Sequence, residues 1–382
     1  MYKKLLLGLC LIVFAVNALP AQSWQQAQPW WYTLEQGKHY FRSGAYGEAL
    51  LAFEDARRSR LAQFTRMEQD LILFLSVPEV RRVGDSLEFV EMFIDHRHET
   101  AAAAALAQLY HHIPKESLNG SVRRVLEELD RLKAYPEAEY WLGETFRAEG
   151  ELALALQQYE KAFSDRSLLE VPGFDIEILY RITEIHRTRQ NYQEMEKQAR
   201  EIVEGMGPSG VPRDSLWVGN PPSYNPIRSA MARILETEGI NRFLTLYRHD
   251  NTSTERAHRL LGFFYYATSR FSPAAEHLMF AFLIQNSILI EEVIRRNYDF
   301  SFSDLESLMV FVRTRPELRA FLEETEYYKT AFYLSSALHA TGKSRPATQL
   351  WDFLSASVDA GEWGNRARRS PGPYIERAIE MP

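Results

Sequence analysis

The segment YWLGETFRAEGELALALQQYEKAF, residues 140–163, contains two amphipathic runs on either side of a short turn at 149–151. Apolar residues recur every three or four positions in both runs, which is the spacing of one helix face. The small residues Gly143, Ala155 and Ala162 stand where two packed helices would cross closely, and aromatic residues flank them. The segment therefore predicts an antiparallel hairpin of two helices in close contact.

A second stretch near the amino terminus repeats this order of residues. It reads LEQGKHYFRSGAYGEALLAFEDARRSR, residues 34–60, with a glycine at Gly37, a turn glycine at Gly44 and an aromatic residue at Phe53. Both stretches resemble the tetratricopeptide repeat, a helix–turn–helix unit of about 34 residues with Leu-Gly, aromatic and alanine positions. Units in this register span about 30–63, 136–169, 176–209, 255–288 and 328–361.

The resemblance implies an all-α fold, a right-handed solenoid of antiparallel helical hairpins. In such solenoids each hairpin packs mainly on its neighbours. The resemblance also implies that the first helix of each hairpin lines a concave groove in which a partner lies. Additional helices outside the repeats are expected at 67–75, 83–96, 101–112, 121–133, 227–236, 240–247, 288–296 and 302–314.

The chain is longer than the roughly 250–300 residues at which single cores stop growing. A cluster of proline and glycine at 205–226 is the strongest break in the helical pattern. We expect a signal peptide at 1–21, an amino-terminal solenoid at 22–204, a loop or linker at 205–226, a carboxyl-terminal solenoid at 227–361 and a tail or cap at 362–382. The cluster is read either as a linker or as a lid over the groove.

The amino-terminal segment has the pattern of a secretory signal. Lys3 and Lys4 precede an apolar run at 5–16, which has the length of a signal core rather than of a membrane span. Cleavage is expected after Ala21 or Ala18, with lipidation of Cys10 or an uncleaved anchor as minor alternatives. We expect a periplasmic protein. Disulfides are not expected, because Cys10 is the only cysteine, and a later membrane span is not expected, because no further segment is long and apolar enough.

Projecting the groove register of the family onto this chain predicts partner-binding residues. The residues are Glu137, Tyr140, Glu144, Arg147, Glu177, Tyr180, Glu184, Arg187, Arg259 and Tyr266. The first four and the next four form the same Glu, Tyr, Glu, Arg series, with side chains on one helix face. Carboxylates, a guanidinium and a tyrosine ring suit an extended peptide. The alternative is structural: solvated pairs within a helix, and tyrosines packed between neighbouring first helices.

Chemical motifs in the sequence are weak. Residues 205–210 match GxGxxG, but the match follows a helix and contains a proline, whereas a dinucleotide site lies between a strand and a helix. His96, His98 and Glu99, with the pair at 111–112, form the only histidine cluster, and we read it as a solvated hairpin end rather than a zinc site. No cofactor or metal is expected, and a formal net charge of −7 argues against nucleic acid as a partner.

These features favour a non-catalytic scaffold or adaptor that binds a segment of another envelope protein in its groove. The alternative is a helical accessory protein of envelope transport that binds a small or lipid-like molecule. A minor alternative is a glycan-processing enzyme of the envelope, since glycosidases need only paired carboxylates. The oligomeric state does not follow from the sequence.

Overall fold

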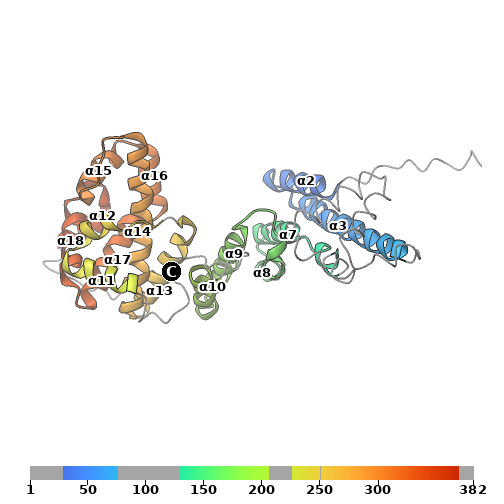
Figure 1. Cartoon of the computed structure of the whole chain (residues 1–382), viewed down its shortest axis with the longest axis horizontal. Coiled ribbons are helices and arrows are strands. Elements are labelled where there is room, and N and C mark those ends of the chain that lie inside the picture. The colour runs from blue at the N-terminus through green and yellow to red at the C-terminus, as the bar shows by residue number, and fades with distance from the viewer. Residues whose placement is uncertain (1–28, 76–126, 128, 206–225, 250, 370–382) are drawn as a thin grey trace, which may run out of the picture. The chain divides into compact units, whose positions relative to one another are not determined.

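The computed structural model describes residues 29–75, 127, 129–205, 226–249 and 251–369, and within them every regular element is a helix (Figure 1). The all-α prediction is therefore confirmed for this part of the chain. The α-helices are α2 Trp30–Arg42, α3 Tyr46–Leu75, α7 Pro136–Ala148, α8 Leu152–Ser164, α9 Phe174–Thr188, α10 Tyr192–Glu204, α11 Pro226–Thr237, α12 Ile240–Leu246, α13 Glu255–Ala267, α14 Phe271–Arg296, α15 Leu305–Arg313, α16 Pro316–Glu324, α17 Tyr327–Ala340, α18 Ser344–Ala356 and α19 Gly361–Arg369. Short 3₁₀ helices are η3 Arg166–Leu168, η6 Thr252–Thr254 and η7 Val358–Ala360.

The chain divides into two compact units, Met1–Glu170 and Val171–Pro382. This boundary differs from the one predicted at 205–226. Most of the 205–226 segment lies outside the described residues. The predicted helices at 83–96 and 101–112, the histidine cluster and the signal segment also lie outside the described residues. These assignments stay predictions.

Paired helices occur in each of the five segments predicted as repeats. The pairs in contact are α2 with α3, α7 with α8, α9 with α10, α13 with α14 and α17 with α18. In each pair the second residue after the first helix has a positive φ: glycine at 44, 150 and 342, but Gln190 at 57° and Ser269 at 58°. Glycine is the residue that adopts this conformation without strain. One local turn is therefore repeated along the sequence.

In the first unit, α3 packs against α7 as well as α2. The buried carboxylate of Glu139, 1% exposed, accepts hydrogen bonds from Arg57 and Lys161, which belong to the two helices that flank α7. Arg60 is also buried: it donates to the carbonyl oxygen of Leu132 at 3.0 Å. These contacts satisfy the charged groups that the packing removes from water.

In the second unit, α10 packs against α13, and α14 packs against α17. The second helix of one hairpin thus contacts the first helix of the next. The long helix α14 is largely buried, and its residues Phe282, Leu283 and Ile284 are fully buried. It is the one described helix long and apolar enough to span a membrane, and 78% of its most apolar window is buried inside the protein. A core helix of a soluble protein has the same properties.

Two helices are longer than the repeat period predicts. Helix α3 continues to Leu75 and α14 to Arg296, whereas the repeat register predicts that those hairpins end near 63 and 288 and that separate helices follow at 67–75 and 288–296. Those separate helices are wrong. No proline or glycine occurs at 48–75 or 274–296, so the intrahelical hydrogen bonds continue.

The segment predicted as a tail or cap begins with a helix. Residues 361–369 form α19, which packs against α17 and α18. The ring of Trp363 lies 5.5 Å from that of Phe332 and 5.6 Å from that of Tyr333, centroid to centroid. The aromatic contact explains why the helix docks there. The rest of the predicted tail or cap, residues 370–382, lies outside the described residues.

The crossing of α7 and α8 depends on a glycine, as predicted. A Cβ atom at Gly143 would lie 2.7 Å from Cε1 of Tyr159, which is fully buried. We expect Gly143→Ala to lower the free energy of unfolding by about 1–2 kcal/mol, because the cost of overpacking exceeds the gain in helix propensity. Urea unfolding measures the change. Gly47→Ala is the control: it is also helical, but its Cβ would meet nothing within 4 Å, so any loss there would contradict the explanation.

Candidate functional site

A cleft of about 140 Å³ lies in the second unit, on the first helices of three hairpins. Helices α9, α13 and α17 each contribute side chains to its wall. The lining residues are Tyr180, Thr183, Glu184, Arg187, Arg256, Arg259, Leu260, Phe263, Glu326 and Lys329. Most of the wall is therefore charged or able to form hydrogen bonds.

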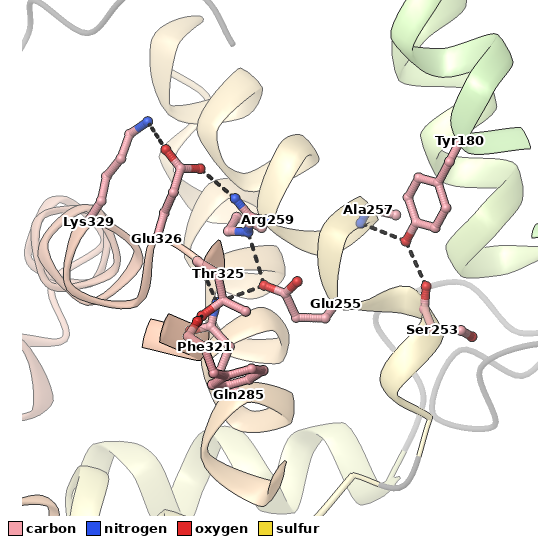
Figure 2. Close-up of polar contacts among 10 residues, drawn as sticks. All are labelled: Tyr180, Ser253, Glu255, Ala257, Arg259, Gln285, Phe321, Thr325, Glu326 and Lys329. Atoms are coloured by element: carbon pink, nitrogen blue, oxygen red, sulfur yellow. Dashed lines mark hydrogen bonds and ion pairs between the residues drawn. The ribbon is translucent and has the colours of Figure 1, made fainter. Parts of the chain in front are cut away.

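Tyr180 joins α9 to the start of α13 (Figure 2). Its hydroxyl donates to the carbonyl oxygen of Ser253 at 2.7 Å and accepts from the backbone N–H of Ala257 at 3.1 Å. The first N–H groups of a helix have no partner within it, and Thr254 supplies no side-chain cap. Burial raises the pKa of Tyr180, which keeps the hydroxyl protonated. Tyr180 therefore serves as a cap for α13 supplied by another hairpin.

Behind the cleft lies a chain of polar contacts among buried groups, also drawn in Figure 2. Oε1 of Glu255 accepts from Nε of Arg259 at 3.0 Å and from Nε2 of Gln285 at 2.7 Å. Gln285 also donates to the carbonyl oxygen of Thr325 at 2.9 Å. Burial raises the pKa of Glu255, while Arg259 and Gln285 act in the opposite direction. The network holds α13, α14 and the segment before α17 together.

Glu326 connects this network to the mouth of the cleft. Its carboxylate accepts from Arg259 and, at 2.7 Å, from Nζ of Lys329. Burial alone would raise the pKa of Glu326, but these two cations lower it below its ordinary value. Its backbone is left-handed, with φ 48°, which costs a non-glycine residue about 1–2 kcal/mol. Residues held in such conformations cluster at functional sites.

The charges in the wall are predominantly positive. Four cations (Arg187, Arg256, Arg259 and Lys329) face two carboxylates (Glu184 and Glu326). Arg256 lies over the ring of Tyr180 at 5.1 Å and 3.9 Å from Glu184. Arg187 is exposed and forms no ion pair within the part of the chain that the structure describes. The cleft therefore offers a guanidinium to an acceptor group.

The structure brings four of the ten predicted residues together in this cleft: Tyr180, Glu184, Arg187 and Arg259. Tyr266 is not among the lining residues; it is 2% exposed, and its ring lies 4.9 Å from that of Tyr333. Glu177 pairs with Arg181 at 2.9 Å, within its own helix. The second unit thus contains both the predicted groove residues and the predicted structural pairs.

The four predicted residues of the first unit have local partners. Tyr140 is 5% exposed and packs its ring against Tyr159 at 5.7 Å. Glu144, also 5% exposed, accepts from the Tyr159 hydroxyl and pairs with Arg147 at 2.9 Å. Glu137 accepts from the backbone N–H of residue 170 at 2.8 Å, and burial raises its pKa. These contacts are structural, but they differ in detail from the alternative interpretation: Tyr140 packs against α8 of its own hairpin rather than between first helices, and Glu144 is buried rather than solvated.

The register did not select Glu326, which lies one residue before α17. Its spacing of three from Lys329 is a signal that could have found it, because such pairs are neighbours on a helix surface. Within residues 29–75, 127, 129–205, 226–249 and 251–369, no group of three or more His, Cys, Asp or Glu side chains is placed to bind a metal.

No protein-family model matches the chain. The chain is similar to an uncharacterized protein of Treponema pallidum, with 24% identity over 337 residues that cover 88% of each protein. It is also similar to an uncharacterized protein of Borreliella burgdorferi, with 20% identity over 259 residues that cover 64% of this chain and 78% of the other. These similarities relate the chain to spirochete proteins and assign no activity.

Proposed function

We propose that this protein is a non-catalytic scaffold that binds an extended segment of another envelope protein in the cleft of its second unit. The observation that carries the proposal is the composition of the wall: three first helices contribute a row of polar side chains and an exposed guanidinium. Backbone carbonyls and carboxylates of a peptide are suitable acceptors for that group. The wall is held by buried contacts, so the ordering cost on binding would fall mainly on the ligand.

We also propose that the hairpins of each unit continue a solenoid of the tetratricopeptide-repeat type. The repeated turn at 44, 150, 190, 269 and 342 supports this, as does the contact of each second helix with the next first helix in the second unit. Secretion to the periplasm remains part of the proposal and rests on the sequence pattern at 1–21.

The test uses Arg187→Ala and, as its matched control, Arg189→Ala. Both arginines are exposed near the end of α9, but Arg189 does not line the cleft. Peptides that bind the wild-type protein are first selected from an array of acidic and neutral sequences. They should bind the Arg187 variant about tenfold more weakly, because one charge-assisted hydrogen bond contributes about 1.5 kcal/mol. The Arg189 variant should bind like wild type.

Fluorescence anisotropy with the selected peptides measures both affinities. Equal loss in the two variants would indicate a non-specific charge effect. Unchanged binding by the Arg187 variant, or failure of every peptide in the array to bind the wild-type protein, would contradict the proposal.

A further inference from the structure

A second, more apolar cavity lies in the same unit, apart from the cleft, where α11 and α12 face two of the repeated hairpins. Its volume is about 170 Å³, and α11 and α12 form one side while α14 and the end of α17 form the other. Phe243 and Phe280 contribute aromatic rings to the wall, and Met231 and Met279 contribute thioethers. All four residues are buried, and Met279, the most exposed of them, is 8% exposed.

The way in which α11 and α12 are attached accounts for the cavity. The bend between them at Gly239 has φ 91°, and a Cβ there would lie 2.1 Å from Oε1 of Gln349. That oxygen accepts from the backbone N–H of Ile240 at 2.9 Å, and Lys343 pairs with Glu236 at 3.1 Å. The two helices are thus fixed to α18 by polar contacts. The apolar faces of α11 and α14 leave a space beside this attachment rather than closing on each other.

We propose that this cavity binds a small, neutral, monocyclic aromatic compound. Drug-sized ligands occupy roughly 300–1,000 Å³, so the cavity is too small for them. It is close to the roughly 150 Å³ of an apolar cavity that accepts benzene. Thioethers make favourable contacts with aromatic ring edges, and the two phenylalanine rings can pack against a third ring.

The chemistry of the wall also indicates neutrality and a single polar substituent. Lys343, the one cation in the lining, is already paired with Glu236, so it does not call for an anionic ligand. Glu276 contributes a carboxylate to the lining, which also disfavours an anionic ligand, and Ser272 and Thr341 contribute hydroxyl groups. A ring with one hydroxyl group, such as p-cresol, matches this combination of volume and polarity.

The experiment follows methionine methyl groups by NMR during titration of the full-length protein with p-cresol. The methyl signals of Met231 and Met279 should shift and saturate together. Met195 and Met309 serve as internal controls, since both are buried but neither lines the cavity, and their signals should stay in place. Absence of a saturable shift, or equal shifts at all four methionines, would overturn the assignment.

A pair of variants supplies a second, independent test. Ala232→Phe introduces a ring at a lining position and should weaken p-cresol binding at least tenfold. Ala230→Phe adds the same ring two positions earlier, outside the lining, and should bind p-cresol as tightly as wild type. Circular dichroism tests whether each variant is folded. If a variant does not fold, the NMR titration of the wild-type protein decides whether the cavity binds p-cresol. Equal affinity of the two variants would contradict the proposed location.

Discussion

Replacing Glu255 with alanine should lower the free energy of unfolding by about 2–4 kcal/mol, because the change removes a buried, charge-assisted acceptor from two donors. Arg259 loses one of its two carboxylate partners and keeps Glu326, and Gln285 loses the acceptor of its 2.7 Å hydrogen bond. Glu255 is 7% exposed, so water cannot replace either contact without rearrangement. Urea unfolding followed by far-ultraviolet circular dichroism measures the change.

Two further variants make this prediction specific. Glu255→Gln retains an acceptor oxygen but no charge, so it should cost less, about 1.5–3 kcal/mol. Glu324→Ala removes a glutamate that is exposed at the end of α16 and should change stability by about 0.5 kcal/mol or less. If the Glu255 and Glu324 alanine variants were equally stable, the buried network would not stabilise the fold as described.

Removal of the Tyr180 ring should have an effect of similar size. Tyr180→Ala should cost about 3–5 kcal/mol, because it opens a cavity and removes two hydrogen bonds. Tyr180→Phe keeps the ring and should cost about 1–3 kcal/mol, since the N–H of Ala257 then lacks its acceptor. Hydrogen exchange of the first turn of α13 should become faster in both variants, while urea unfolding reports the overall change.

Tyr192→Phe is the matched control for the hydroxyl. Tyr192 begins α10 in the same hairpin, and its ring stacks on Phe264 at 6.1 Å. Its hydroxyl makes no hydrogen bond among the described residues, so the control should unfold like wild type. A Tyr180→Phe protein as stable as the control would show that the hydroxyl does not cap α13. Because Tyr180 is structural, its alanine variant does not test ligand binding, which is why Arg187 is preferred.

Sequence periodicity predicted the hairpins because their determinants are local. Gly143 and Tyr159 are sixteen positions apart and meet at the predicted crossing, and the turn residues follow each first helix directly. The extra length of α3 could also be predicted in principle, since no proline or glycine occurs between Glu48 and Leu75. At this position the repeat period and the absence of helix breakers predict different ends for the helix.

The contacts of the predicted groove residues cannot be deduced from their positions in the repeat register. Arg181, rather than Arg187, pairs with Glu177 and approaches Glu184 at 3.5 Å. Because Arg181 forms these ion pairs, Arg187 remains exposed at the cleft. The partners of Tyr180 lie 73 and 77 positions away, at Ser253 and Ala257. Nothing in a helical pattern specifies such pairs, so the same Glu, Tyr, Glu, Arg series has different contacts in the two units.

The link from Tyr180 to α13 also bears on the order of folding. It closes a loop of 77 residues, whereas the two hairpins that it joins are formed by neighbours in sequence. Loop closure costs entropy before the contact is gained, so we expect the local hairpins to form first and the tyrosine to dock late. Contacts formed after the rate-limiting step mainly slow unfolding. We therefore expect this single hydroxyl to affect the lifetime of the native second unit more than the speed at which the unit forms.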